Sequence, residues 1–289
     1  MRFQLLDIRN TFVGFSRLCE LISATKGLEF DDLEVDFGLV SWFDANMCAP
    51  FGALLYQINS ALNEVTLTNL KPSVKRILCK NGFLSAYGEE RAPDTYGTTI
   101  EYTRFEPKDE RFFASYVEHH FTGKGMPRMS QGLDKRFSES VFEIFNNAVL
   151  HSKTRLGIYA CGQFFPAKKR LDFSIADLGI GIRRNIHNQL GLDFSPEDAI
   201  LWAIRDKNTT KTGSVPGGLG LKLLKEFVSI NGGRIQIVSE RGYWEFAGGN
   251  ISTNQFSSGF PGTVVNIEIN TADENSYCLA SEISSDNIF

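Results

Sequence analysis

The chain has 289 residues, of which 42% are hydrophobic and 22% are charged, and this composition is typical of a globular protein with one large domain or two. The formal net charge is -4, which argues against a strongly basic nucleic-acid surface. No apolar run is long enough to span a membrane, and residues 1–10 lack the apolar core of a secretory signal. The five cysteines are scattered and form no C-x-x-C pair, which favours free thiols and gives no support to a zinc site. We therefore expect a cytoplasmic protein, with no indication of a membrane or nucleic-acid partner.

The first hundred residues alternate between strand-like and helix-like periodicity. The spacing predicts strands at 2–8, 33–37 and 64–70, and helices at 11–25 and 48–62. A further helix is predicted to begin near Pro72 and to end at Asn81-Gly82. This order predicts a largely parallel or mixed sheet packed by helices.

Two segments of this region give it a weak resemblance to a STAS-like domain, the fold of anti-sigma-factor antagonists. They are DFGLVSWFDA at 36–45, followed by a helix, and the strand EVTLTNL at 64–70. In that family the phosphorylated serine usually follows an aspartate before the helix. Here Ala45 follows Asp44, so a phosphorylation switch is not supported at that position, and Ser41 falls in the strand-like part. An unrelated α/β scaffold accounts equally well for the pattern.

Residues 85–110 are rich in glycine, proline and charge, and we place the domain boundary within or just after them. The expected organisation is a small α/β domain at 1–100, a linker and leading helix at 101–133, a second domain at 134–272, and a polar, frayed tail at 273–289.

The second domain is organised around an amphipathic helix at 138–152, SESVFEIFNNAVLHS. Glu143 and Asn147 are four residues apart, so they share a face opposite the apolar side chains. A carboxylate and a carboxamide in this arrangement can hold a water and a metal ion. Taken alone, the pattern is more typical of a solvated helix surface.

Two downstream motifs change this interpretation. Asp177 follows a predicted strand and begins D-x-G-x-G, and a G-G-L-G-L segment opens a predicted helix. Asp177 can accept a hydrogen bond from the amine of adenine, while Gly179 and Gly181 leave room for the base and adopt backbone conformations that a side chain would penalise. The glycines at 217, 218 and 220 let the backbone and a helix N-terminus approach phosphates.

Each motif alone is often only a turn or a helix entry, but the ordered set of three in matching contexts is unlikely by chance. The sequence has no G-x-x-x-x-G-K-[ST], which excludes a P-loop site, and neither GIGIRR nor GLGLKL completes the dinucleotide-binding G-x-G-x-x-G.

The three motifs resemble those of the GHKL family, which includes gyrase ATPase subunits, heat-shock chaperones, histidine kinases and MutL. The resemblance covers roughly residues 110–270 and implies a Bergerat fold, an α/β sandwich in which helices cover one face of a mixed sheet. EIFNNAVLHS matches the family's N-box, DLGIG and GGLGLKLL match its two glycine boxes, and Gly262-Thr263 matches its terminal glycine-threonine strand. Residues 183–216 would then form a lid over ATP.

The resemblance implies ATP and Mg²⁺ as cofactors. Asn147 is the implied metal ligand and Glu143 the implied general base. The implied nucleotide-binding residues are Asn147, Asp177, Gly179, Gly181, Lys211, Gly217, Gly218, Leu219, Gly220, Leu221 and Thr263. We expect His151, two turns beyond Glu143, to have a structural role.

Three functions remain open from the sequence. The first is an ATP-dependent conformational switch with slow hydrolysis and a protein partner. The second is a serine/threonine protein kinase of the anti-sigma-factor type acting on a STAS-type partner, so the sequence leaves ATPase and kinase undecided. The third is a decayed binding module, which the intact motifs disfavour. Dimerisation is common among relatives, but nothing in the sequence encodes a homodimer interface.

Overall fold

The computed structural model describes residues 1–205 and 219–282, without the side chains of residues 219 and 220. Its N-terminal unit contains a three-stranded parallel sheet in the order β1-β2-β3. The strands are β1 (Arg2–Gln4), β2 (Asp32–Asp36) and β3 (Glu64–Thr68), and the helices are α1 (Phe12–Ala24), α2 (Cys48–Ser60) and α3 (Pro72–Lys80). Strands alternate with helices as the sequence predicted. The resemblance of this unit to a STAS-like domain stays a prediction.

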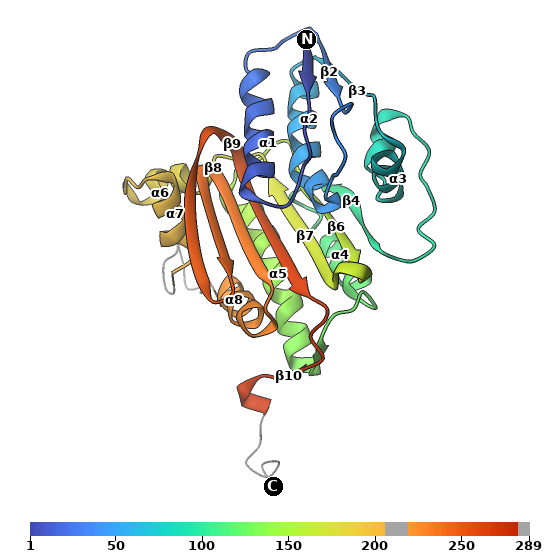
Figure 1. Ribbon diagram of the computed structural model, residues 1–289. Helices are drawn as coiled ribbons and strands as arrows, with labels where there is room; N and C mark the ends of the chain where they lie inside the picture. Colours follow the sequence, from blue (N-terminus) through green and yellow to red (C-terminus); the bar gives the residue numbers. More distant parts are fainter. Residues whose placement is uncertain (206–218, 283–289) are drawn as a thin grey trace.

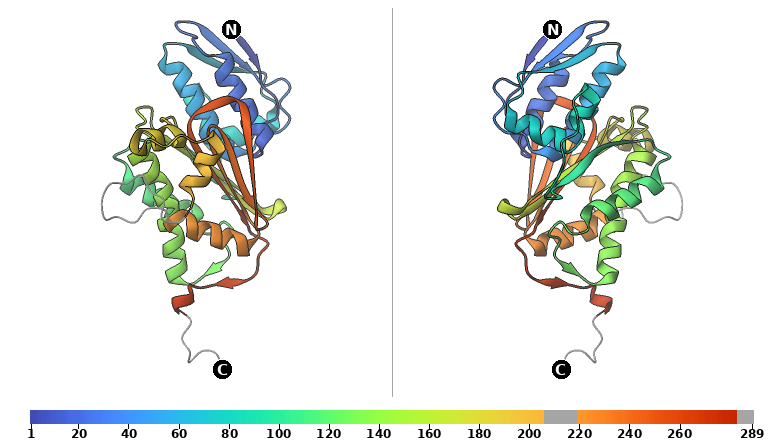
Figure 2. Two further views of the ribbon diagram at one scale, coloured as in Figure 1. Left: turned by 90° about the vertical axis from the view of Figure 1, so that its left-hand side faces the viewer. Right: turned by 90° about the vertical axis from the view of Figure 1, so that its right-hand side faces the viewer.

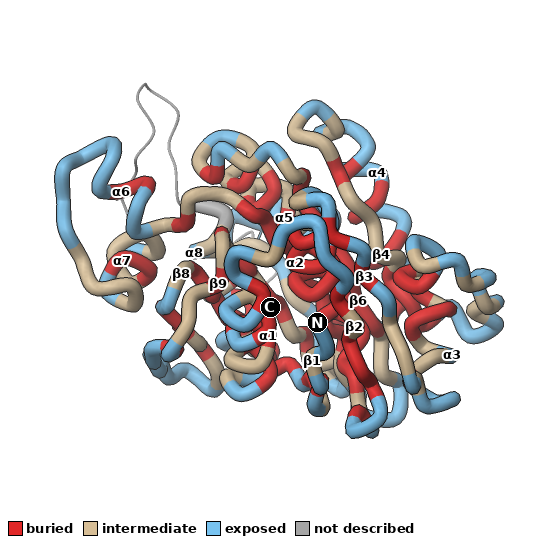
Figure 3. Tube along the Cα trace, turned by 90° about the horizontal axis from the view of Figure 1, so that it is seen from above, coloured by how far each residue is buried: buried red, intermediate tan, exposed pale blue. Residues whose placement is uncertain are grey.

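Local signals in the sequence explain where two of these helices begin. The Thr11 side chain accepts a hydrogen bond from the Gly14 N–H and caps α1, and Pro72 occupies the first turn of α3. Helix α2 is buried along most of its length and appears red in Figure 3. A helix that is apolar on nearly all sides must be covered on nearly all sides, so α2 lies between two sheets.

The second sheet has five strands in the order β4-β6-β7-β9-β8, and each neighbouring pair is antiparallel. The strands are β4 (Thr99–Phe105), β6 (Ile158–Phe165), β7 (Arg170–Asp177), β8 (Arg234–Ala247) and β9 (Asn250–Asn270). One face is covered by α4 (Glu110–Phe121), α5 (Gln131–His151) and α8 (Leu219–Asn231) (Figures 1 and 2). This arrangement confirms the predicted Bergerat-type α/β sandwich, with an antiparallel sheet.

Shorter elements complete the described chain. Helices α6 (Ile182–Leu190) and α7 (Pro196–Ala203) follow β7, and β5 (Arg128–Met129) pairs in parallel with β10 (Ser276–Tyr277). Within the described residues, 3-10 helices occur at Ala45–Met47, Phe83–Tyr87, Pro166–Lys168 and Ala280–Glu282.

The structure differs from the sequence prediction in two stretches, one before and one after the second domain along the chain. Strand β4 lies partly in the stretch expected to be a linker. The sequence did not predict this strand, because β4 pairs with β6, whose residues are about sixty positions away along the chain. Residues 276–282, expected to belong to a frayed tail, make specific contacts. The ring centroids of Tyr277 and Phe227 lie 5.5 Å apart, and Ser130 Oγ donates to Glu282 Oε2 at 2.5 Å. The position of the domain boundary stays a prediction.

The N-terminal unit packs on the face of the five-stranded sheet opposite α5, so the molecule has four layers. Helix α2 lies against β6 and β7, and α1 lies against β9 (Figure 1). One continuous apolar core joins the two units, and it includes Leu54 of α2 and Tyr159 of β6. A second core fills the space between the five-stranded sheet and its own helices.

A buried polar cluster lies within the interface between the two units. Asn46 Nδ2 donates to Ser174 Oγ at 2.9 Å and to Asn266 Oδ1 at 2.7 Å, and Asn266 Nδ2 donates to Gln236 Oε1 at 3.0 Å. These four residues are at most 2% exposed. Because a buried polar group that loses its partner is costly, the cluster fixes how the N-terminal unit sits on the sheet.

Replacing Asn46 with alanine is expected to lower the free energy of unfolding by about 2 kcal/mol, since Ser174 and Asn266 lose a buried donor. Urea unfolding followed by circular dichroism measures this change. Asn59→Ala is the matched control, because Asn59 is exposed on α2 and its loss should change stability by less than about 0.5 kcal/mol. Equal stability of the two variants would contradict a stabilising role for the cluster.

Candidate functional site

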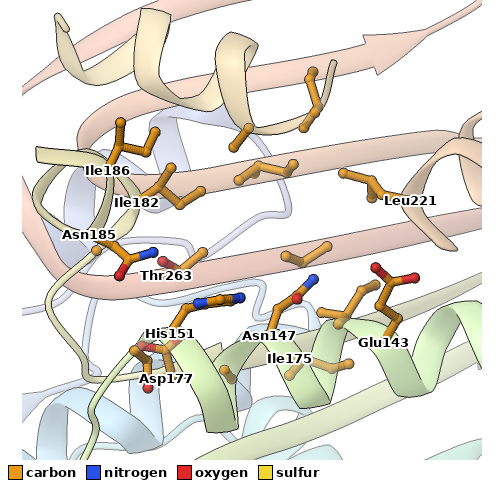
Figure 4. Close-up of a pocket in the computed structure, with 18 of the residues that line it drawn as sticks. Glu143, Asn147, His151, Ile175, Asp177, Ile182, Asn185, Ile186, Leu221 and Thr263 are labelled. Atoms are coloured by element: carbon orange, nitrogen blue, oxygen red, sulfur yellow. The ribbon is translucent and has the colours of Figure 1, made fainter. Parts of the chain in front are cut away.

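A pocket lies between α5, α6, α7 and α8 and the strands β7, β8 and β9 (Figure 4). Its polar lining consists of Glu143, Asn147, His151, Ser152, Asp177, Asn185 and Thr263. Its apolar lining includes Ile144, Ile175, Ile186, Leu221, Ile237 and Val265. A largely apolar pocket with a few convergent polar groups is typical of a small-molecule site.

Helix α5 supplies one wall of the pocket. It begins seven residues earlier than the sequence predicted, after Ser130, whose side chain accepts a hydrogen bond from the Leu133 N–H. Glu143, Asn147 and His151 follow one another at four-residue spacing, so their side chains share the face toward the pocket (Figure 4). Asn146 is not among the lining residues. Asn147 therefore faces the pocket and its neighbour Asn146, about 100° away around the helix, does not.

Asp177 ends β7 at the base of the pocket and is 4% exposed. Its Oδ1 accepts a hydrogen bond from the Gly179 N–H at 2.8 Å. Burial raises the pKa of Asp177 to about 7, although hydrogen bonds from the backbone of Gly179 and Thr263 act in the opposite direction. A carboxylate that is poorly hydrated and open to a pocket is a strong acceptor for a ligand's N–H group.

The glycines around Asp177 allow close approach of the backbone. A side chain at Gly179 would come within 2.2 Å of the Ser152 carbonyl oxygen, so this glycine packs the turn against the end of α5. Gly262 has a φ of 120°, and a Cβ there would lie 2.1 Å from the Asp177 carbonyl oxygen. Gly181 and Thr263 line the pocket itself, whereas Gly179 does not.

The predicted phosphate-side residues are only partly within the described chain. Leu221 lines the pocket, and Leu219 and Gly220 belong to the first turn of α8. Lys211, Gly217 and Gly218 lie outside the described residues. In the described part of the chain no group of three or more His, Cys, Asp or Glu side chains could hold a metal by itself.

The sequence interpretation missed several lining residues, among them Asn185, Ile182 and Ile186 of α6. Asn185 and Ile186 lie in the stretch expected to be a lid, and Ile182 immediately precedes it. Their spacing of three and four residues was the available signal. Ser195 caps α7, because its side chain accepts a hydrogen bond from the Asp198 N–H. Trp202 and Ala203, near the end of this helix, also reach the pocket.

An antiparallel sheet with helices on one face, and a pocket built from E-x-x-x-N, D-x-G-x-G and a glycine-threonine strand, together define a nucleotide-binding domain of the Bergerat type. Residues 132–273 match the family model described as histidine kinase-, DNA gyrase B-, and HSP90-like ATPase. This segment is therefore a GHKL-type ATPase domain. No curated protein matches the chain significantly. None of the helices at 1–205 or 219–282 is long and apolar enough to cross a membrane.

The raised pKa of Asp177 predicts a specific effect of pH on stability. Between pH 3.8 and about 7 the unfolded chain releases a proton that the native chain retains, so this residue makes the native state less stable as pH rises through that window. Asp177→Asn lacks this titration. Its stability relative to the wild type is expected to rise between pH 4.5 and 7.5, by on the order of a few kcal/mol.

Urea unfolding of both proteins at several pH values within that window measures the difference. A constant offset caused by the new amide would cancel in the comparison. A difference in stability that does not change with pH would contradict the raised pKa.

Proposed function

We propose that the chain binds ATP with Mg²⁺ in this pocket and uses the nucleotide as a conformational switch, with slow hydrolysis. The observation that carries the proposal is the convergence of Glu143, Asn147, Asp177 and Thr263 on one pocket, within a segment that belongs to an ATPase family. Convergence matters because these residues come from one helix and two separate strands.

The end of the pocket at Asp177 suits an adenine base. The buried carboxylate accepts a hydrogen bond from the exocyclic amine, and Thr263 adds a hydroxyl beside it. Ile175, Ile186 and Val265 provide apolar contacts for the faces of the base. A base without the exocyclic amine would leave Asp177 unpaired and would therefore bind more weakly.

The other end of the pocket suits the triphosphate. The N-terminal turn of α8 lies there, and a helix N-terminus attracts phosphate through its N–H groups and dipole. Asn147 provides a neutral oxygen for Mg²⁺, and a metal held mainly by phosphates and water needs only one or two protein ligands. The donor set in the pocket therefore fits Mg²⁺ bound together with nucleotide. Lys211, Gly217 and Gly218 belong to the proposal on the family resemblance alone.

Glu143 is the proposed general base. It lies one helical turn from Asn147 on the pocket face of α5. In this position its carboxylate can orient a water toward the terminal phosphorus and accept the proton as the new P–O bond forms, which releases ADP and phosphate.

The packing of the N-terminal unit supports the switch. Neighbouring residues of a strand point to opposite faces of a sheet, so β9 directs Val265 into the pocket and Asn266 into the buried polar cluster. A nucleotide that shifts these strands would alter the packing of the N-terminal unit against the five-stranded sheet. We propose that a protein partner reads this change through that unit.

Incubation with γ-labelled ATP tests hydrolysis and its alternative together. We expect label in free phosphate, and Glu143→Ala is expected to reduce its release at least 100-fold while ATP binding is retained. Glu139→Ala is the matched control, because Glu139 is an exposed residue one turn earlier on α5 that pairs with Arg136. Label on protein would indicate the serine/threonine kinase instead. Wild-type phosphate release by Glu143→Ala would remove Glu143 from the mechanism.

Asn147 and Asn146 provide a second test, of metal binding. ATP with Mg²⁺ is expected to raise the melting temperature of the wild type, because a ligand that binds only the native state stabilises it. Asn147→Ala should lose most of the Mg²⁺-dependent part of this shift, whereas Asn146→Ala should retain it. The measurement is thermal unfolding with ATP in the presence of Mg²⁺ or of a chelator. Equal losses in both variants would count against Asn147 as the metal ligand.

A further inference from the structure

The pairing of β8 with β9 is interrupted beside the pocket. Ser239 pairs with Thr263, but the next residue, Glu240, pairs with Phe260, so β9 carries extra residues at this point. Glu240 has a φ of 52°, a left-handed conformation that is uncommon for residues other than glycine. Irregular pairing and local strain of this kind often re-aim side chains next to functional sites. Here they direct Ser239 and Glu240 toward α6.

Ser239 caps α6 from another part of the chain. Gly181 occupies the N-cap position of this helix and has no side chain to offer. The Ile182 N–H donates instead to Ser239 Oγ at 2.8 Å, which satisfies one of the N–H groups that a helix leaves without an internal partner. Ile182 and Asn185 of this helix line the pocket.

The same hydroxyl also holds Thr263. Ser239 Oγ donates to the Gly262 carbonyl oxygen at 3.2 Å and lies 3.1 Å from Thr263 Oγ1. A serine hydroxyl has one proton and two acceptor sites. When that proton goes to Gly262, the Thr263 hydroxyl must donate to Ser239, and its own acceptor sites remain for the pocket.

Glu240 strengthens this connection between β8 and α6. Its carboxylate forms an ion pair with Arg183 at 3.2 Å. A side chain at Gly181 would lie 2.8 Å from Glu240 Cγ and 3.1 Å from Ser239 Oγ. The first turn of α6 is therefore packed directly against Ser239 and Glu240.

We propose that Ser239 is a positioning residue for recognition of the adenine base, an inference that rests on the proposed function. It is 2% exposed and is not among the residues that line the pocket. Its hydroxyl group contacts both the start of α6 and the Thr263 hydroxyl, and it thereby fixes the position of one relative to the other. Without this hydroxyl group, the start of α6 and the Thr263 side chain can move away from their positions. The hydrogen bond between the amine of the base and Asp177 is then weaker.

Equilibrium binding of ATP and of purine riboside triphosphate, which lacks the 6-amino group, tests this role. Ser239→Ala is expected to weaken ATP binding about tenfold, because it removes a set of buried hydrogen bonds. Ser239→Ala should weaken binding of the analogue less, so the ratio of the affinity for ATP to the affinity for the analogue becomes smaller. A merely structural role would lower stability without changing this preference.

Two further variants separate hydrogen bonding from packing. Ser239→Cys fills nearly the same space with a much weaker hydrogen-bonding group, so it is expected to resemble Ser239→Ala. Ser140→Ala is the matched control, because Ser140 is a buried serine whose hydroxyl donates to the Arg136 carbonyl oxygen within α5. It should leave the preference between the two nucleotides unchanged. Melting temperatures without nucleotide report whether each variant is folded.

The outcomes distinguish this proposal from the proposed function. If the wild type binds ATP and Ser239→Cys retains both affinity and preference, the positioning role of Ser239 is overturned while the ATP site stands. An unchanged preference in Ser239→Ala, with affinity lowered equally for both nucleotides, would overturn it as well. If the wild type binds neither nucleotide, the proposed function fails and this inference fails with it.

Discussion

The pairing of β7 with β9 is the constraint on which the rest of the structure depends. Strand β7 is buried on both faces, so every residue between Arg170 and Asp177 must suit one of two different environments. One face receives α5 and the pocket, and the other receives the N-terminal unit. Strand periodicity divides the residues between them without ambiguity, because a slip of one position would exchange the two faces. Asp177 and Thr263 meet at the pocket end of this pairing.

Burial explains the chemistry at both faces of this pairing. At the pocket it raises the pKa of Asp177 to about 7, so the carboxyl group is held where a ligand donor would compensate for lost hydration. Behind the sheet, burial raises the pKa of Asp172 to about 8, although the neighbouring Arg170 acts in the opposite direction. Both aspartates lie on β7, but their side chains point to opposite faces of the sheet. Because the effective dielectric constant of a protein interior is low, the pKa of each aspartate depends strongly on the groups packed against it.

The N-terminal unit is part of the same packed body and is not attached by a linker alone. It contributes to an apolar core shared with β6 and β7, and Phe12 of α1 stacks on Phe256 of β9 with ring centroids 4.7 Å apart. The hairpin formed by β8 and β9 is thereby held by α1 on one side and by α7 on the other. Since α7 also borders the pocket, packing connects the pocket and the N-terminal unit by two routes.

The sequence by itself determined the local motifs and much of the architecture. The E-x-x-x-N spacing and D-x-G-x-G after a strand act over a few residues, and each led to the correct element. Only the tertiary structure decided the pairing of β4 with β6, the pairing of β10 with β5, and the cap that Ser239 provides to α6. These depend on contacts between residues far apart in the chain, and no local periodicity records such contacts. Asn46 is the clearest case, because its partners Ser174 and Asn266 lie more than a hundred residues away.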